Sequence, residues 1–421
     1  MDGSSLTFQL LVGKFSPVHK ATVAPRVDFF RISVDTTKQS LLPSWERSRE
    51  RSQSEDDGWK KGASHKIRLA RGPPQVVKHT LEDIGRLAGV SRSTVSRVVN
   101  DQDSVSPEVR QRVQSVIAQT GFIPNVAARS LASNRSGVIG LVIPSRVHAL
   151  FQDPYFGRLI QGISAASNDA GQTLSLFLFQ TESEEERLYP RVVSSGLVDG
   201  VILTASRMGD PLMESLMDST MPFVVIGRPD VPDRVSYVDA DNVDGARQAA
   251  RHLCGLGHTR IGYVGAPLST SAGVDRLEGF REGLAACGAE LDPDLRADGL
   301  FSEQSGYEAM HKIYKNRPEA VFVASDTMAM GVLRALRELG ASVPQDICLV
   351  SFDGLPSAET STPALTTVSQ PITQTGVRAV ELLLGLVRGD LAGPVAEVMP
   401  TKLMVRDSCG ANTTSQVAEV G

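Results

Sequence analysis

One short predicted helix, residues 92–100, carries hydrogen-bonding side chains along its outward face. These side chains are Arg92, Ser93, Ser96 and Arg97. Arginine can donate two parallel hydrogen bonds to guanine, and serine can reach a phosphate or a base edge. The valines of the same helix fall on its opposite face, which predicts that this face is buried. The pattern favours contact with DNA, although many enzymes also contain a three-helix cluster with an exposed arginine.

The residues around this helix predict a helix-turn-helix. Thr80 is a suitable N-cap for a preceding helix with one apolar stripe, and Gly89 ends that helix. Ser91 caps the helix of residues 92–100, and Pro107, at a first helical position, opens a third helix. In a helix-turn-helix the N-terminal end of the second helix enters the major groove of DNA.

Residues 137–400 alternate short aliphatic strands with amphipathic helices. This alternation is typical of parallel, doubly wound sheets, and the segment is long enough for two of them. The predicted strands are 138–143, 174–179, 200–203, 223–226, 260–264, 320–324 and 348–352. The predicted helices include 156–170, 244–256, 276–287 and 328–339.

Charge is distributed unevenly along the chain. The net charge of −5 would by itself argue against a nucleic-acid partner. However, residues 1–75 carry 13 basic and 8 acidic side chains, residues 76–136 carry 8 and 5, and residues 137–421 carry 22 and 35. This asymmetry favours a basic module for a polyanion on an acidic body; the alternative is chance together with a basic tail.

Residues 1–75 are predicted to be disordered. The segment 44–61 is polar and charged and has no apolar period, so it cannot bury enough surface to offset its ordering entropy. The extension could track the DNA backbone as a basic arm. The alternative is that it is passive or does not belong to the native product, and the complete DNA-binding unit directly after it favours this second possibility.

Several function classes lack their sequence signals. Gly255 and Gly257 precede a strand instead of following one and have no third glycine, so they do not form a dinucleotide loop. There is no phosphate-binding P-loop, no nucleophile elbow and no metal-binding spacing among the 7 histidines and 4 cysteines. No apolar run is long enough for a membrane span, and no signal peptide is evident. We therefore expect a non-enzymatic protein of the cytoplasm, without a cofactor, metal or membrane partner.

The chain resembles the lactose/galactose repressor (LacI/GalR) family in three strings: GVSRSTVSRVVN, VSPEVRQRV and GFIPNVAARSLASNRSGVIGLVIP. The resemblance runs from about Thr80 to Arg406 and is most specific in its N-terminal part. It implies that Arg92, Ser93 and Arg97 read bases, whereas Thr94, Ser96 and Asn100 hold phosphates. The DNA-binding set is completed by Thr80, Asn125, Ala128 and Leu131.

The segment Asn125–Ala132 resembles the hinge helix of that family. Its alanines would let two such helices, one from each protomer, pack closely inside a DNA groove. Leu131 matches the family's leucine wedge, which partly unstacks a base step and kinks the duplex. The alternative is an ordinary linker helix with a leucine at a packing position. Because a helix this short is marginal in water, we expect it to form only on DNA.

The resemblance also implies a core with the two-subdomain fold of periplasmic sugar-binding proteins. The ligand of such a core lies in the cleft between the subdomains, at the carboxyl ends of the strands. Arg276 matches the effector-binding arginine, whose planar fork suits vicinal hydroxyls or a carboxylate. Tyr155 and Phe156 match a segment that places an aromatic face against the ligand, and Phe301 matches a stacking position.

Four further residues complete the predicted effector site. Asp326 and Asp353 end strands and match positions that accept hydrogen bonds from ligand hydroxyls, while Asp244 and Gln370 are weaker members. Each residue also has a simpler explanation, since strand-end aspartates often cap the next helix, an arginine can form a surface ion pair, and a phenylalanine can belong to the core. Residues 145–152 are expected to form a longer loop than is usual in the family, at the cleft mouth.

Together these features predict a DNA-binding transcriptional regulator, most simply a repressor, controlled by a small molecule with sugar as the leading class. We expect a homodimer on a two-fold pseudo-palindromic operator. The rival hypotheses are a solute-binding protein and a sugar-acting enzyme. The expected domains are a disordered extension (1–75), a helix-turn-helix domain (76–124), a hinge helix and linker (125–136), an effector-binding and dimerisation core (137–406) and a flexible tail (407–421).

Overall fold

The computed structural model describes residues 79–99, 104–122, 135–204, 209–391 and 393–411. The chain divides into two compact units, one helical and one α/β. The predicted hinge helix, with Asn125, Ala128 and Leu131, lies outside the described residues, as do Asn100 and residues 1–75.

The helical unit contains three helices: α1 (Leu81–Ala88), α2 (Arg92–Val99) and α3 (Pro107–Thr120). Thr80 begins α1 as predicted, because its side chain accepts a hydrogen bond from the backbone N–H of Asp83 while the Asp83 carboxylate accepts one from the N–H of Thr80. One fully buried side chain from each helix, Ile84, Val95 and Val113, meets in the core.

Two glycines shape the turn between α1 and α2. Gly89 ends α1 with φ of 64°, a left-handed conformation that glycine adopts without strain. A Cβ atom on Gly85 would lie only 2.8 Å from the carbonyl oxygen of Val90, so a larger residue would push the turn away from α1. Leu87 of α1 does not belong to this core, since the residue is 54% exposed.

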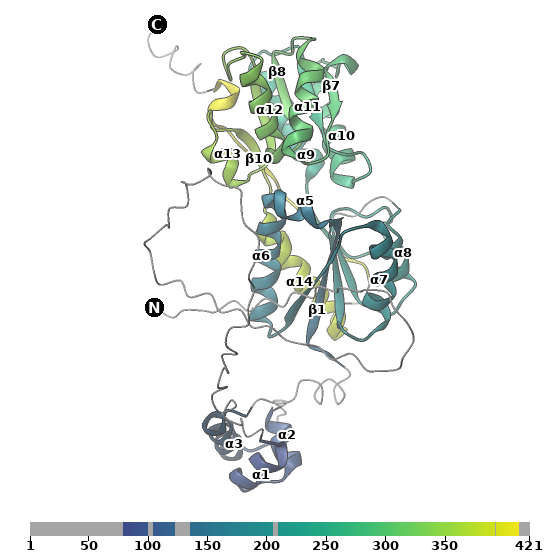
Figure 1. Cartoon of the computed structure of the whole chain (residues 1–421), viewed down its shortest axis with the longest axis vertical. Helices are drawn as coiled ribbons and strands as arrows, with labels where there is room; N and C mark the ends of the chain where they lie inside the picture. Colours follow the sequence, from purple (N-terminus) through teal and green to yellow (C-terminus); the bar gives the residue numbers. More distant parts are fainter. Residues whose placement is uncertain (1–78, 100–103, 123–134, 205–208, 392, 412–421) are drawn as a thin grey trace, which may run out of the picture. The chain divides into compact units, whose positions relative to one another are not determined.

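The α/β unit contains two six-stranded sheets, and the first subdomain is built on the sheet β11-β5-β4-β3-β1-β2. All of its strand pairs are parallel. Helices α6 and α14 cover one face, and α7 and α8 cover the other (Figure 1). The strands are β1 (Val138–Arg146), β2 (Thr173–Phe179), β3 (Gly200–Thr204), β4 (Phe223–Ile226), β5 (Tyr237–Ala240) and β11 (Ala396–Met399); the helices are α5 (Val147–Gln152), α6 (Pro154–Asp169), α7 (Glu182–Ser194), α8 (Pro211–Met217) and α14 (Ile372–Arg388).

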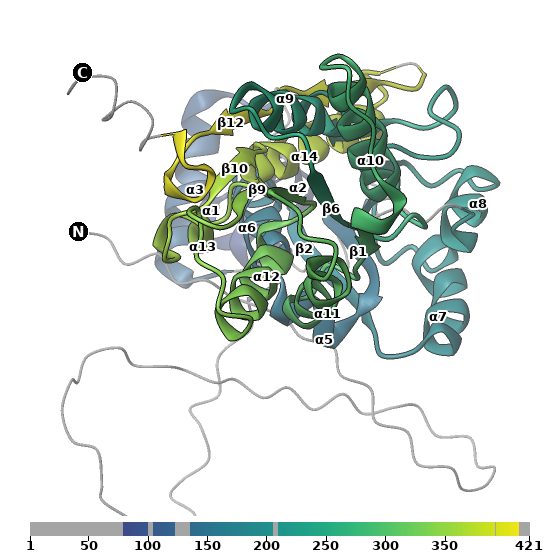
Figure 2. The same ribbon diagram turned by 90° about the horizontal axis from the view of Figure 1, so that it is seen from above.

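The second subdomain is built on the sheet β12-β10-β9-β8-β6-β7. Helices α9 and α10 lie on one side of this sheet and α11 and α12 on the other (Figure 2). Only β12, at one edge, is antiparallel to its neighbour. The strands are β6 (Ile261–Gly265), β7 (Arg296–Asp298), β8 (Ala320–Val323), β9 (Cys348–Asp353), β10 (Thr366–Ser369) and β12 (Lys402–Met404); the helices are α9 (Asn242–Gly255), α10 (Ser271–Ala285), α11 (Glu303–Tyr314), α12 (Asp326–Glu338), α13 (Pro356–Thr360) and the 3₁₀ helices η1 (Pro293–Leu295) and η2 (Asp407–Cys409).

The chain crosses between the two subdomains three times. It leaves β5 for α9, returns from β10 to α14, and leaves β11 for β12. Neither subdomain is therefore a continuous piece of sequence, which explains why the sequence predicts one core rather than two separable domains. Side chains next to a crossing can therefore contact residues of both subdomains.

Two predicted irregular segments are ordered instead. The first residues of the predicted flexible tail, 407–409, form η2, because the Ser408 hydroxyl accepts from the N–H of Thr366 at 2.8 Å and donates to the carbonyl of Leu349 at 2.8 Å. The predicted long loop of residues 145–152 is instead the end of β1 followed by α5. Among the described residues, no helix is both long and apolar enough to cross a membrane.

Candidate functional site

The predicted DNA-reading residues lie on one surface of α2. Arg92, Ser93 and Arg97 are exposed, and Thr94 and Ser96 are partly buried. This surface exists because Val95 and Val98 take the opposite side of the helix into the core. The geometry therefore presents two guanidinium groups and several hydroxyls from one helix face.

The start of α2 is held in place by hydroxyl groups. Ser91 accepts from the N–H of Thr94 at 3.1 Å, and its oxygen lies 2.7 Å from the hydroxyl of Ser93 and 2.8 Å from that of Thr94. Arg92 forms an ion pair with Glu82 of α1, with 3.2 Å between Nε and the carboxylate. Both partners are mostly exposed, so the pair is weak and can give way to a phosphate.

Arg276 of α10 is the centre of a polar cluster where the two subdomains meet. Its side chain is 5% exposed. It donates to the side-chain oxygen of Asn242 at 2.9 Å and to the carbonyl of Ala324 at 2.5 Å, and it forms an ion pair with Asp353 at 3.1 Å. Its guanidinium carbon lies 3.8 Å from the ring centroid of Phe352. A buried guanidinium held on several sides is a pre-positioned donor for a polar ligand.

Asp353 ends β9 in an unusual conformation. Its φ is 115°, a region that non-glycine residues rarely adopt, and such strain is often found at functional sites. Gln370, beside the second crossing, donates to its carboxylate at 2.7 Å. Burial raises the pKa of Asp353 to about 7, although Arg276 opposes the rise.

The first subdomain contributes Tyr155 and Asp239 to the same cluster. Burial raises the pKa of Tyr155, and the charges of Asp239 and Asp353 raise it further, which places this phenol among carboxylates of both subdomains. Burial and the like charge of Asp275 raise the pKa of Asp239 to about 7. Asp239 also accepts from the side-chain amide of Asn242 at 3.1 Å. We refer to Tyr155, Asp239, Asn242, Arg276, Asp353 and Gln370 as the junction site.

Direct hydrogen bonds join the subdomains around the junction site. Arg228, after β4, donates through Nε to Asp275 of α10 at 3.0 Å, and a second nitrogen bonds the other carboxylate oxygen. Thr327 donates to Asp153 at 3.1 Å, where Asp153 also caps α6. Arg158 donates to the carbonyl of Gly354 at 2.9 Å. The sequence does not predict Arg228, Asp239 and Asn242 as members of the site, because they belong to no recognisable motif and reach it only through the crossings between the subdomains.

The other predicted effector residues occupy different surroundings. Asp326 is fully buried and accepts from Ser351 of β9, Thr367 of β10 and the N–H of Leu355, so it links the start of α12 to both strands. Phe156 packs into the core of the first subdomain, with its ring edge-on to that of Tyr155 at 5.4 Å. Phe156 therefore contacts a member of the junction site, and the charge of Asp326 helps to raise the pKa of Asp353.

Phe301 and Asp244 make contacts with other parts of the second subdomain. Phe301 has φ of 56° and packs, partly buried, against the core of the second subdomain. Asp244 pairs with Arg247 at 3.0 Å and accepts from Gln248 at 2.7 Å on the outer side of α9. The carboxylate of Asp244 is thus engaged on its own helix, while Asn242 at the start of α9 faces Arg276.

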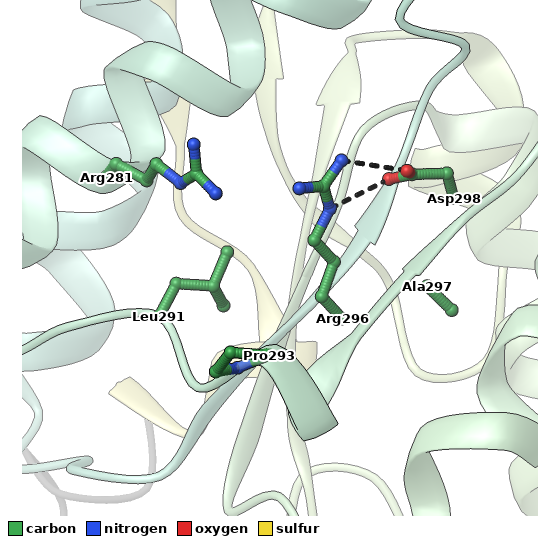
Figure 3. Close-up of a pocket in the computed structure, with 6 residues that line it drawn as sticks. All are labelled: Arg281, Leu291, Pro293, Arg296, Ala297 and Asp298. Atoms are coloured by element: carbon green, nitrogen blue, oxygen red, sulfur yellow. Dashed lines mark hydrogen bonds and ion pairs between the residues drawn. The ribbon is translucent and has the colours of Figure 1, made fainter.

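A cavity of about 310 Å³ lies elsewhere in the second subdomain, at the edge strand β7. Figure 3 shows Arg296 bonded to Asp298 beside it and the guanidinium of Arg281 directed toward that of Arg296. Leu291, Pro293 and Ala297 complete its lining. None of the residues predicted to bind the effector lines this cavity, so the junction site remains the candidate.

Known protein families match both units of the chain. Residues 80–125 match the family described as bacterial regulatory proteins, lacI family, and residues 250–409 match a periplasmic binding protein-like domain. The transcriptional regulator CelR of Thermobifida fusca is 40% identical over 333 residues, which cover 78% of this chain and 98% of CelR. The ribose operon repressor of Escherichia coli (strain K12) is 31% identical over 310 residues, which cover 72% of this chain and 92% of that repressor.

Solved structures of this family have the same architecture. A CelR–cellobiose complex matches with a TM-score of 0.63 and 38% identity, covering 79% of this chain and 100% of that chain. The lac repressor dimer bound to operator and the anti-inducer ONPF matches with a TM-score of 0.67 and 26% identity, covering 79% and 99%. These relatives are transcriptional regulators and not enzymes, and the predicted combination of a helix-turn-helix with two parallel-sheet subdomains is confirmed. The chain belongs to the LacI family of bacterial regulatory proteins.

Proposed function

We propose that this regulator represses transcription from an operator and that a small polar effector, a sugar, bound at the junction site controls its DNA affinity. The observation that carries the proposal is the buried guanidinium of Arg276, which lies among hydrogen-bonding groups at the meeting point of both subdomains. A ligand there touches both halves of the core at once.

The chemistry of the junction site suits a ligand rich in hydroxyl groups. Carboxylates such as Asp239 and Asp353 accept hydrogen bonds from hydroxyls, Arg276 donates to their oxygens, and the phenol ring of Tyr155 supplies an apolar surface. Two relatives support the sugar class, since CelR has been solved with cellobiose and another relative is named the ribose operon repressor.

Effector control requires that the ligand prefer one arrangement of the subdomains over another. The Arg228–Asp275 and Arg158–Gly354 contacts hold the present arrangement. A sugar that exchanges hydrogen bonds with these or neighbouring groups changes the balance between the arrangements. Binding of the effector at the junction site would thus change the arrangement of the two subdomains, and this change would alter DNA affinity.

On the DNA side, we propose that the protein acts as a homodimer on a two-fold pseudo-palindrome. One helix the length of α2 covers a single half-site, so a second copy is needed for a full operator. The lac repressor, a relative, has been solved as a dimer bound to operator. Arg92, Ser93 and Arg97 would then read bases, and Thr94, Ser96 and Asn100 would hold phosphates.

The test is a titration of operator binding with sugars, using DNA from upstream of the gene and full-length protein. Footprinting first locates the operator, and fluorescence anisotropy then measures its release as cellobiose and other sugars are added. Asp353→Asn is expected to abolish the response while leaving operator affinity within about twofold. The matched control is Asp298→Asn, the same chemical change in the same subdomain, beside the β7 cavity.

The outcomes separate the two halves of the proposal. If Asp353→Asn loses the response to sugar and the control Asp298→Asn keeps it, the result supports the junction site. An unchanged sugar titration in Asp353→Asn would remove this residue from the site, and absence of any footprint would contradict the operator itself.

A further inference from the structure

Two cysteines from neighbouring helices come together on the second subdomain, away from the junction site. Cys254 lies in the last turn of α9 and is partly buried, and Cys287 lies just beyond the end of α10 and is exposed. The thiol of Cys287 is among the groups that raise the pKa of Cys254, as expected of neighbouring thiols. We propose that Cys254 and Cys287 are a modification site, a dithiol that peroxides or small disulfides oxidise to an intramolecular disulfide joining α9 to α10.

The packing of α9 against α10 explains why the thiols meet. A Cβ atom on Gly279 would lie 2.0 Å from the carbonyl oxygen of Val243, and one on Gly283 would lie 2.6 Å from the Cβ of Ala250. The helix backbones therefore approach closely at two successive turns of α10. One turn of α9 leads from Ala250 to Cys254, and the last residues of α10 lead from Gly283 to Cys287, just beyond its end.

Both cysteine backbones are anchored at this position. The N–H of Cys287 donates to the carbonyl of Leu284 at 2.9 Å, and the carbonyl of Cys254 accepts from the N–H of Gly257 at 2.9 Å. An ion pair earlier along the two helices, Arg247–Glu282 at 2.6 Å, also links them. Disulfides need closely spaced Cα atoms, and the close packing of α9 on α10 together with their fixed ends favours such a spacing.

The accessibility of the two thiols sets the order of the reaction. The exposed Cys287 thiolate attacks a peroxide oxygen, the O–O bond breaks, and Cys287 becomes a sulfenic acid while hydroxide leaves. The sulfur of Cys254 then attacks the sulfur of Cys287, the S–O bond breaks, and water leaves with the proton of Cys254. Two thiols lose two electrons in total, and these reduce the peroxide to water.

The reverse reaction begins at the same exposed atom. A dithiol reductant attacks the sulfur of Cys287 and releases Cys254 as the leaving thiolate. Burial and the neighbouring thiol raise the pKa of Cys254 to about 12, so it leaves slowly and the disulfide persists once formed. Because the sulfur of Cys287 is exposed, a reductant can still reach the bond, which makes it reversible and not a permanent structural one.

The other two cysteines provide an internal control. Cys348 and Cys409 are buried in the same subdomain. The sulfur of Cys409 lies 3.1 Å from the hydroxyl oxygen of Thr366 and 3.3 Å from a ring nitrogen of His252. An oxidant in solution reaches neither of them in the folded protein.

The experiment treats folded, full-length protein with hydrogen peroxide, then unfolds it, alkylates the free thiols and maps the peptides by mass spectrometry. We expect a pair of peptides from one chain that are linked through Cys254 and Cys287 and separated by dithiothreitol. Cys348 and Cys409 should stay reduced through the peroxide treatment and be recovered as alkylated cysteines. In Cys254→Ser no link forms and Cys287 proceeds to sulfinic acid; in Cys287→Ser, Cys254 stays alkylated. Cross-links between chains, or over-oxidation of Cys287 in the wild type with Cys254 still alkylated, would overturn the proposal.

A second measurement tests the disulfide through its effect on the melting temperature of the protein. The oxidised wild type should melt higher than the reduced protein by on the order of 5 °C, because the bond restricts the unfolded chain. Peroxide should not shift the melting temperature of either serine variant upward, and an equal upward shift in those variants would contradict the disulfide. These readouts stand whether or not the core binds an effector.

Discussion

The guanidinium of Arg228 donates to both carboxylate oxygens of Asp275 and thereby joins the two subdomains of the core. Arg228 follows β4 in the first subdomain, and Asp275 directly precedes Arg276 in α10 of the second. The same helix turn therefore carries a contact that holds the subdomains together and the arginine proposed to bind the effector. A ligand that moves Arg276 also moves Asp275.

A double-mutant cycle measures the strength of this contact. The Asp275 side chain is 5% exposed and that of Arg228 is 40% exposed, so water screens the pair only from one side. We expect a coupling free energy of about 1–2 kcal/mol between Arg228→Ala and Asp275→Ala in urea unfolding. The control pair is Arg388–Asp390, with side chains 55% and 63% exposed, for which about 0–0.5 kcal/mol is expected. A coupling free energy between Arg228 and Asp275 as small as that of the control pair would show that the two side chains do not interact in solution.

The pH dependence of stability tests the environment of Asp239. Its pKa of about 7 lies above the ordinary value of 3.8, so the folded state holds the proton more tightly than the unfolded state does. The free energy of unfolding should therefore fall as pH rises from about 4 to about 7. Asp239→Asn should make this fall shallower without abolishing it, because burial also raises the pKa of Asp353.

Urea titrations of the ligand-free protein at several pH values measure this slope. Asp233→Asn removes an exposed carboxylate from the neighbouring loop and serves as the control. If Asp239→Asn and Asp233→Asn change the slope equally, general charge repulsion rather than the junction site is responsible.

Arg97 tests the DNA-reading surface. We expect Arg97→Ala to cost about 1–3 kcal/mol on the best operator and to relax base preference, as the loss of a bidentate contact with guanine does. Arg86→Ala removes an exposed arginine from α1 that is paired with Asp83 at 2.9 Å, and it should leave the preference intact. A loss of affinity for Arg97→Ala that is equal on random DNA would make Arg97 a phosphate contact instead.

Individual residues show how much of the fold and of the site can be predicted from the sequence. Local signals were sufficient for the helical unit, since the capping by Thr80 and the turn at Gly89 depend only on neighbouring residues. Asp244 shows the limit. The helix α9 begins at Asn242, and two residues along a helix rotate a side chain by about 200°, so the amide faces Arg276 while the carboxylate faces outward.

The junction site could be predicted only in part for a related reason. Arg276 lies in the helix after β6 and Asp353 ends β9 of the same subdomain, so the order of the elements indicates that they are neighbours. Arg228 and Asp239 reach the same place from the other subdomain, across crossings that are far apart in sequence. Asp326 could not be distinguished from a ligand-binding aspartate, because its three donors, Ser351, Thr367 and the N–H of Leu355, follow it by 25 residues or more.

The last prediction concerns residues 1–75, which lie outside the described residues. We expect a chain beginning at Val76 to bind the operator and respond to the effector as the full-length protein does, since the helix-turn-helix begins with the cap at Thr80. The competing idea is that the 13 basic side chains of the extension act as an arm on flanking phosphates. Each phosphate neutralised would add about 0.9 to the slope of log affinity against log salt concentration. Anisotropy titrations of both chains between low and moderate salt give that slope. Matching slopes and affinities support a passive extension, whereas a slope shallower by about two or more in the shortened chain would show that the arm binds DNA.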